Sequence, residues 1–184
     1  SFTGTGCSGK STLLKMCQEH YGDRFQYVTE VTRPLARKGF KINEEGDSAT
    51  QRAIIDAHIR NNKLDDVIMD RCIVDGYVYT EWLFTHQKVD EETYEYAANT
   101  LNEILNDVDI IFYCCPLEME DDGERSTSTK FQSDIDSIMT QLLYQDEWNS
   151  SYENTLITLE YKDVDKRFED IKIAIEEHEH STTR

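Results

Sequence analysis

Basic residues are scarce in this sequence, which has 19 Lys and Arg against 37 Asp and Glu and a formal net charge of −18 at pH 7. A protein that binds nucleic acid or an anionic membrane by displacing counterions needs a basic face, so we expect neither as a general partner. A phosphorylated small molecule is not excluded, because a few local cations can dominate the potential inside a pocket.

Long apolar runs are missing as well, since no stretch approaches the roughly 20 residues of a membrane-spanning helix. No signal-peptide pattern is present either. The five cysteines are odd in number and form no C-x-x-C pair, which favours a reducing compartment over a disulfide framework. Together these absences predict a cytoplasmic protein without membrane association.

Proline is also rare, with two residues in 184, and this leaves room for long helices. Hydrophobic residues make up 38% of the chain, enough for a packed core in a protein that can bury about 70% of its unfolded surface. We find no internal repeat and no linker, so we predict a single domain over residues 1–184. The chain starts without Met inside an expected strand, so we expect a few residues to precede Ser1.

Strand-like and helix-like segments alternate along the sequence. We expect strands at residues 1–3, 25–29, 66–70, 109–115 and 156–159, and helices at residues 12–20, 48–58, 74–84, 91–106, 135–144 and 164–178. We expect a basic loop from Arg33 to Lys41 and a mobile acidic lid over about residues 117–134. The alternation predicts an α/β fold of three layers, with a parallel five-stranded sheet flanked by helices on both faces.

The most specific motif is Gly-Thr-Gly-Cys-Ser-Gly-Lys-Ser at residues 4–11, which fits the phosphate-binding pattern G-x-x-x-x-G-K-[ST] in full. Its three glycines permit positive-φ turns, so that backbone N–H groups can wrap around phosphate oxygens at a helix N-terminus. Lys10 would place an ammonium on the β- and γ-phosphates, and the Ser11 hydroxyl is suited to Mg²⁺. We therefore predict nucleotide binding by the following residues: Gly4, Thr5, Gly6, Cys7, Ser8, Gly9, Lys10, Ser11 and Thr12.

Charged residues follow two of the predicted strands, at the carboxyl edge where open α/β sheets bind ligands. Asp70 is placed to hold the water shell of Mg²⁺ or to polarise an attacking hydroxyl, or else to cap a helix. Glu30 can act as a general base on the acceptor or form a salt bridge to Arg33 or Arg71. Arg71 can contact a substrate phosphate or pair with Glu30, and Arg33 has the planar fork suited to phosphate or carboxylate.

The sequence gives weaker evidence for two further candidate site residues. Gln51 can read a base edge through its amide, although an exposed helical glutamine is the more common case. Arg125, in the acidic segment after the fourth strand, can close over the γ-phosphate and exclude water. The alternative for this segment is a solvated charged surface.

At these positions the sequence resembles the P-loop nucleoside and nucleotide kinases and their AAA-like relatives, such as the nicotinamide riboside kinase domain. The similarity runs from Gly4 to about Leu159. In thymidylate and deoxynucleoside kinases an acid–Arg pair ends the third strand, which looks like Asp70 with Arg71. Their second-strand acid is often a base or a substrate ligand, which looks like Glu30.

The lid is similar to that of the nicotinamide riboside kinase-like relatives, through Asp-Asp-Gly-Glu-Arg at residues 121–125. Gln51 looks like the glutamine with which deoxynucleoside kinases hold the base. The usual arginine-rich lid is reduced here to Arg125 and Lys130. The resemblance implies a P-loop NTPase fold, ATP and Mg²⁺ as cofactors, and an assembly that is often a homodimer.

The hypothesis is therefore a Mg²⁺-dependent phosphotransferase that moves the γ-phosphate of ATP to a nucleoside- or nucleotide-type small molecule. In this hypothesis Lys10, Asp70, Arg125 and Glu30 are catalytic, Ser11 and Asp70 hold the metal, and Glu30, Arg33, Gln51 and Arg71 contact the acceptor. Whether Glu30 or Asp70 is the base stays open. One alternative is a kinase acting on a polynucleotide or a modified base in DNA, with the basic stretch as a strand-binding rim. Another is a regulatory ATP-binding module without an acceptor.

Overall fold

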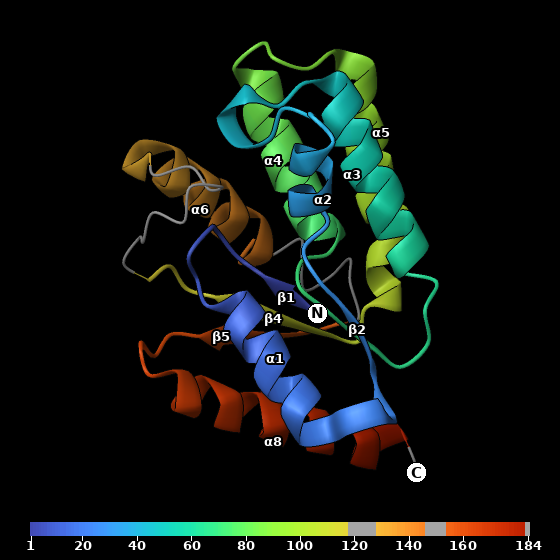
Figure 1. Cartoon of the computed structure of the whole chain (residues 1–184), viewed down its shortest axis with the longest axis vertical. Helices are drawn as coiled ribbons and strands as arrows, with labels where there is room; N and C mark the ends of the chain where they lie inside the picture. Colours follow the sequence, from blue (N-terminus) through green and yellow to red (C-terminus); the bar gives the residue numbers. More distant parts are fainter. Residues whose placement is uncertain (118–127, 146–153, 183–184) are drawn as a thin grey trace.

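Strands and helices alternate along the chain (Figure 1), whose computed structural model describes residues 1–117, 128–145 and 154–182. The strands are β1 (Phe2–Thr3), β2 (Gln26–Val28), β3 (Val67–Met69), β4 (Ile110–Cys114) and β5 (Thr155–Leu159). The α-helices are α1 (Lys10–Tyr21), α2 (Thr32–Arg37), α3 (Ser48–Asn61), α4 (Ile73–Thr85), α5 (Glu91–Ile104), α6 (Thr129–Leu143) and α8 (Val164–Thr182). The alternation of strands and helices predicted from the sequence is confirmed.

All strand pairs among the described residues are parallel, but they form two sheets rather than one. β1, β4 and β5 form a sheet in the order β1-β4-β5, and β2 pairs with β3. A single parallel bridge between Phe2 and Asp70 connects the two sheets. The expected continuous five-stranded sheet is therefore corrected to three strands plus two, because β1 is only two residues long and forms a ladder on one side only.

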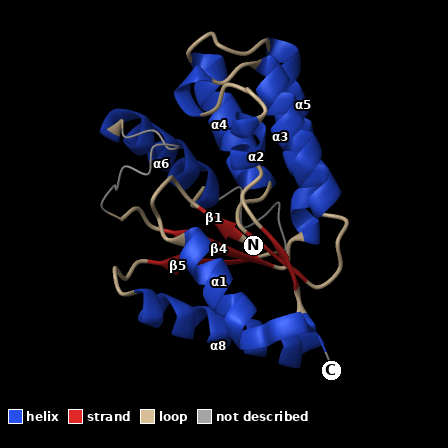
Figure 2. Ribbon diagram, viewed as in Figure 1, coloured by secondary structure: helices blue, strands red, loops and turns tan. Residues whose placement is uncertain are grey.

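Helices cover both faces of the strands and produce two separate cores (Figure 2). On one face, α1 and α8 pack against the strands around Phe2, Leu13 and Ile171. On the other face, α3 to α6 enclose a larger core. β4 serves both cores, because Ile111 and Tyr113 point to the larger one while its alternate residues point to the smaller. This arrangement confirms the predicted α/β fold of three layers.

The helices α3 and α2 each carry, at their start, a residue that suits that position. Asp47 caps α3, since its side chain accepts a hydrogen bond from the backbone N–H of Thr50. The expected loop from Arg33 was wrong, because the chain forms the short helix α2 there. Pro34 lies in the first turn of α2, where its missing N–H removes no helical hydrogen bond.

The predicted lid over residues 117–134 divides into two parts. Residues 118–127 lie outside the described residues. Residues 129–134 belong to α6, which begins where the Ser128 hydroxyl accepts a hydrogen bond from the N–H of Phe131. The buried Phe131 and Ile135 attach α6 to the larger core, so this part of the segment is a packed helix.

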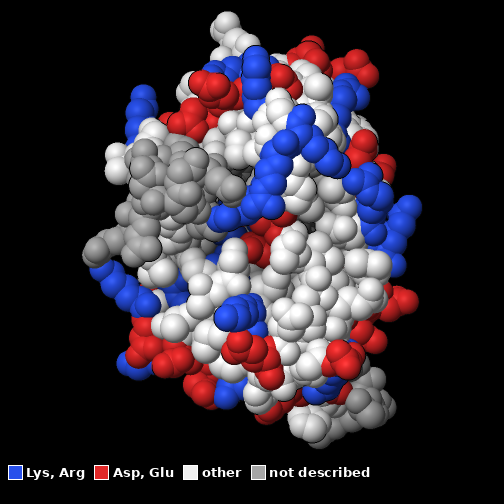
Figure 3. Space-filling model, in the orientation of Figure 1, with Lys and Arg blue, Asp and Glu red and all other residues white. Residues whose placement is uncertain are grey.

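Within the described ranges, every helix is too short or too polar to span a membrane. The five cysteines, which all lie in the described part of the chain, form no disulfide. Exposed basic side chains gather on and after α2 (Figure 3), where Arg37, Lys38 and Lys41 are exposed.

Candidate functional site

The phosphate-binding motif forms the turn between β1 and α1, so its residues 4–12 lie at the N-terminus of a helix as predicted. Gly4 has φ +139°, and a Cβ added there would lie 2.6 Å from the carbonyl oxygen of Cys114. Gly9 has φ +85° at the start of α1. The expectation that Gly6 also needs positive φ is wrong: nothing lies within 4 Å of a Cβ placed there, and Cys7 takes the positive φ of 57° instead.

Lys10 is folded back onto the loop. Its ammonium donates hydrogen bonds to the carbonyl oxygens of Gly4 (3.0 Å) and Thr5 (2.6 Å) and to the hydroxyl of Ser8 (2.9 Å). The side chain is only 5% exposed. Burial lowers the pKa of Lys10, and the nearby Arg71 guanidinium lowers it further. An entering anion would therefore find a partly desolvated ammonium already inside the loop.

Ser11 and Asp70 come from different elements and meet beside this loop. The Ser11 hydroxyl donates to Oδ2 of Asp70 at 2.6 Å. The other carboxylate oxygen, Oδ1 of Asp70, is buried and has no hydrogen-bond partner among the described residues. An orphaned buried carboxylate oxygen next to a hydroxyl is a set of hard oxygen ligands of the kind that Mg²⁺ prefers. The two residues thus fit the metal that the sequence motif implies.

The remaining strand-end residues form a buried ion-pair cluster around Arg71, which we call the Arg71 cluster: Glu30, Arg71 and Asp75. Arg71 donates from Nε to Glu30 at 3.0 Å and from a terminal nitrogen to Asp75 at 2.6 Å. The same terminal nitrogen donates to the carbonyl oxygen of Gly4 at 3.1 Å. Arg71 has φ +83°, a backbone conformation that costs free energy and is held here by these contacts.

Glu30 makes both of the salt bridges considered from the sequence. Its Oε1 accepts from Arg71 and from the hydroxyl of Thr32 at 2.7 Å. Its Oε2 lies 3.4 Å from Nε of Arg33, which is half-buried on α2. The carboxylate is therefore held in place by Arg71, just after β3, and by two residues of α2.

Two hollows meet at this cluster. The first has about 310 Å³ of empty space and is lined by the loop residues Ser8 to Thr12, with Glu30, Asp70 and Arg71. The second has about 380 Å³ and runs between α3 and α4. Its lining includes Glu30 and Arg71 again, together with Gln51, Ile54, His58 and Tyr79. The two hollows are thus adjacent, with Glu30 and Arg71 between them.

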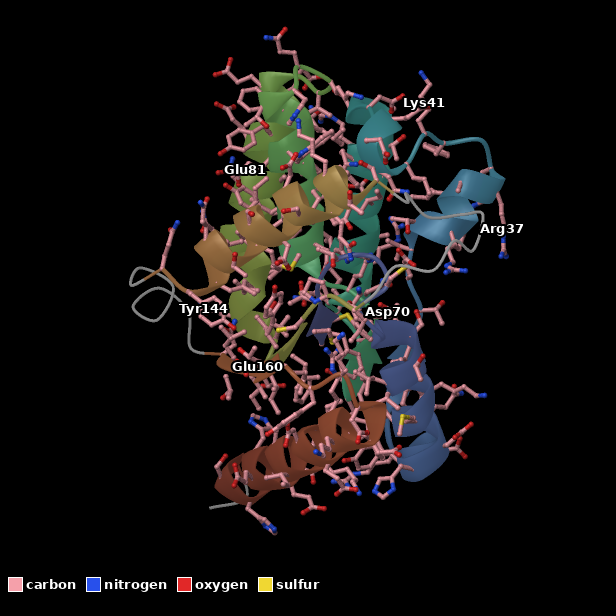
Figure 4. All side chains as sticks on the ribbon, turned by 90° about the vertical axis from the view of Figure 1, so that its left-hand side faces the viewer. Arg37, Lys41, Asp70, Glu81, Tyr144 and Glu160 are labelled. Carbon is pink, nitrogen blue, oxygen red and sulfur yellow. The ribbon has the colours of Figure 1, made fainter. Side chains whose placement is uncertain are left out.

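Gln51 is only 1% exposed and lines the second hollow, so the alternative considered for it, an exposed helical glutamine, does not apply. Asp70 lies near the centre of the molecule beside the first turn of α1, whereas Arg37 and Lys41 lie at the outer edge (Figure 4). Apart from Arg33, the basic stretch is therefore remote from the buried cluster. Arg125 lies outside the described residues.

Three residues that the sequence analysis missed hold the loop. Asp75 is 3% exposed and accepts from Arg71 and from the Thr3 hydroxyl. Gln132, on α6, donates to the carbonyl oxygen of Gly6 at 2.9 Å. Arg167 is 1% exposed on α8 and donates to the carbonyl oxygens of Ser8 (2.7 Å), Cys115 (3.0 Å) and Tyr161.

For two of these residues the sequence carried a signal. Asp75 stands four residues after Arg71 at the start of an expected helix, which is ion-pair spacing. Arg167 stands four residues before Ile171 on the apolar face of the last helix, where a charged side chain is out of place unless it has buried partners. Gln132 carried no such signal.

This loop and its neighbours are shared with a known family. The family model for the AAA domain matches residues 1–167. The chain belongs to the AAA domain family. No curated protein matches this AAA domain in sequence.

Solved structures show the same fold. Deoxyadenosine kinase from M. mycoides, with the products dCMP and dCDP bound, has a TM-score of 0.70 at 15% identity, over 96% of this chain and 97% of the other. The same enzyme with dATP gives 0.68 at 16% identity, over 95% and 97%. The YorR protein from Bacillus subtilis, in complex with phosphorylated GDP, gives 0.55 at 14%, over 97% and 96%. This AAA domain therefore has a fold like that of P-loop nucleoside kinases.

Gly4 and Gly6 differ in the room that a side chain would have, and this difference allows a matched test. Gly4→Ala forces a Cβ against the Cys114 carbonyl at a φ that Ala avoids, so we expect a loss of about 2 kcal/mol or more in the free energy of unfolding. Gly6→Ala meets no atom within 4 Å. It should leave the stability unchanged or raise it by up to about 1 kcal/mol, by restricting the unfolded chain. Urea unfolding of both variants measures the difference, and equal losses would contradict the loop geometry.

Proposed function

We propose that this AAA domain is an ATP- and Mg²⁺-dependent phosphotransferase, acting within one domain on a nucleoside- or nucleotide-type small molecule. The observation that carries the proposal is the meeting of two hollows at Glu30 and Arg71. One hollow is lined by a phosphate-binding loop and the other by α3 and α4. Group transfer needs a donor site and an acceptor site that meet at the reacting atoms, and this arrangement supports both.

On the donor side, the loop amides and the Lys10 ammonium would bind the phosphates of ATP. Ser11 and Asp70 would hold Mg²⁺, which neutralises charge on the β- and γ-phosphates when it is bound. The orphaned Oδ1 of Asp70 supports this assignment, since a buried carboxylate oxygen without a partner is costly unless something occupies it.

On the acceptor side, Glu30 is better placed than Asp70 to serve as the base. Glu30 lines both hollows, while Asp70 lines only the one at the phosphate loop. In the proposed step the acceptor oxygen forms a bond to the γ-phosphorus, its proton passes to the Glu30 carboxylate, and the bond to the bridging oxygen of ADP breaks. Arg71 would position Glu30 and keep it ionised, and Arg33 would contact the acceptor beside it. If the acceptor group is a phosphate, no proton needs to be taken.

The acceptor class is supported by the second hollow and by the structural relatives. The hollow is lined by helical side chains, including the buried amide of Gln51. Relatives with the same fold bind dCMP, dCTP, dATP and a GDP derivative. We infer a nucleoside or nucleoside monophosphate as acceptor, with phosphorylated products and ADP.

The deciding experiment is a screen for acceptor-dependent release of ADP. Nucleosides, deoxynucleosides, their monophosphates and nicotinamide riboside are each supplied with ATP and Mg²⁺. One of these small molecules should stimulate ADP release. Stimulation by single-stranded DNA alone, weakening with salt, would favour a polynucleotide kinase instead. ATP binding that no acceptor converts into turnover would favour a regulatory module.

Lys10→Ala should abolish acceptor-dependent ADP release, because it removes the one ammonium that the loop holds for the phosphates. The control is Lys15→Ala, which removes an exposed cation from the same helix and should keep the wild-type rate. Circular dichroism of both variants checks that they are folded. A Lys10 variant that turns over normally would refute the donor-site assignment.

Arg125→Ala should lower kcat by roughly 10²-fold or more, as losses of arginines over a transferring phosphate do. Arg60→Ala, at an exposed position of α3, is the control for loss of one surface arginine. Steady-state kinetics at saturating ATP and acceptor measure the effect. A wild-type kcat would mean that the acidic segment is only a charged surface.

A further inference from the structure

Arg167 is a buried cation that contacts the phosphate loop from the last helix. It stands in the first turn of α8 and is only 1% exposed. Its guanidinium donates hydrogen bonds to the carbonyl oxygens of Ser8 at 2.7 Å, of Cys115 at 3.0 Å and of Tyr161. Phosphate transfer as described above gives Arg167 no part.

The partners of Arg167 do not by themselves call for a charged side chain. All three are neutral carbonyl oxygens, and within the described ranges Arg167 forms no ion pair with a carboxylate. A neutral donor could bond to a carbonyl oxygen without the cost of taking a full charge out of water. A cationic donor, however, also polarises the peptide group to which it bonds. The charge is therefore useful if one of these peptide groups has to bind a further partner.

The peptide group between Ser8 and Gly9 is the one that can do so. Its carbonyl oxygen accepts from Nη1 of Arg167, and its N–H is the backbone donor of Gly9. The described chain has no cis peptide bond, so this N–H points away from the guanidinium, on the opposite side of the peptide group. Arg167 also lies close to Gly9 itself, since a Cβ added there would lie 3.9 Å from Nη1.

The hollow at the phosphate loop has Gly9 in its lining. Residues 8–12 line this hollow, whereas Arg167 is not among the described residues that do. Gly9 is the N-cap of α1, and no side chain in the described part of the chain caps this helix. The first N–H groups of α1 are therefore left for a ligand, and a phosphate suits them in charge and in hydrogen bonding.

We propose that Arg167 is a positioning residue for the nucleotide: it fixes and polarises the Ser8–Gly9 peptide group, so that the N–H of Gly9 binds a phosphate. The inference rests on the proposed function, because it requires the phosphates of ATP to enter this loop. Arg167 acts through the peptide group and does not touch the nucleotide. Its contribution should therefore appear in the affinity for the phosphate chain, whatever base and sugar the chain carries.

The test uses two substitutions that differ in charge. Arg167→Met removes every hydrogen-bond donor and keeps an unbranched side chain. Arg167→Lys keeps a cation that can donate to the Ser8 carbonyl oxygen. Lys166→Met is the matched control, because it removes an exposed cation from the neighbouring position of α8. Circular dichroism and urea unfolding establish which variants are folded.

Calorimetry in the presence of Mg²⁺ measures the binding of two probes, ADP and inorganic tripolyphosphate. Tripolyphosphate has neither base nor sugar, so it reports on the loop alone. The Met variant should bind both probes about tenfold more weakly or worse, and by a similar factor, since each loses a hydrogen bond to a charged group. The Lys variant should recover part of this loss, and the Lys166 variant should bind like the wild type.

The amide proton of Gly9 gives a readout that a merely structural role of Arg167 would not move. In the wild-type protein its NMR resonance should shift downfield when ADP is added, because the N–H gains a phosphate acceptor. The shift should be smaller in the Met variant and partly restored in the Lys variant. If the Met variant is unfolded, the wild type and the Lys variant decide: an unmoved Gly9 resonance in wild type saturated with ADP overturns the inference.

The outcomes separate the inference from the proposed function. If a folded Met variant binds both probes as the wild type does, Arg167 only attaches α8 to the core; the inference is then overturned and the donor site stands. A loss for ADP without a loss for tripolyphosphate would place the effect at the base or the sugar and also overturn it. If the wild type binds neither probe, the donor site is rejected and the inference with it.

Discussion

A buried guanidinium has to find its hydrogen-bond partners inside the protein, and at Arg71 those partners come from three separate parts of the chain. Arg71 follows β3 directly, yet it donates to Glu30 after β2, to Asp75 on α4 and to the carbonyl oxygen of Gly4. Removing any one partner would leave charge or a polar atom unpaired at low dielectric. These contacts fix the end of β2, the start of α4 and the entry to the phosphate loop relative to one another.

The phosphate loop is held from its outer side by similar means. Its carbonyl oxygens accept hydrogen bonds from Arg71, Gln132 and Arg167, which belong to three different elements. Side chains from distant parts of the chain thus fix the backbone of the loop. For the proposed phosphotransferase, a loop fixed in this way would be organised before a phosphate arrives, as electrostatic stabilisation of a transferring group requires.

The sequence predicts the features that depend on residues close together in the chain, and it fails for features that depend on residues far apart in the chain. The alternation of strands and helices, and the place of residues 4–12 at the start of a helix, follow from residues close together in the chain, and these predictions were confirmed. The division of the sheet and the helix at Thr32–Arg37 were missed, because no local pattern in the sequence indicates either of them.

The same reasoning applies within the site. The strand-end rule placed Glu30, Asp70 and Arg71 at one edge of the sheet, and the structure brings them together there. Arg167 reaches a loop residue 159 positions earlier, and Gln132 one 126 positions earlier, so no local pattern could assign their partners.

The strongly acidic composition is compatible with this site because potential inside a pocket is set by the nearest charges. Lys10, Arg71 and Arg167 are each at most 8% exposed and all contact the phosphate loop. Three buried cations would oppose folding if they lacked partners, and here carbonyl oxygens and the carboxylates of Glu30 and Asp75 supply them. For Lys10 and Arg167 the hydrogen-bond partners in the described part of the chain are carbonyl and hydroxyl oxygens, which do not cancel the positive charge. Around the loop these three cations therefore stand beside three carboxylates, Glu30, Asp70 and Asp75, so the strong negative charge of the whole protein, −18, is not repeated at this site.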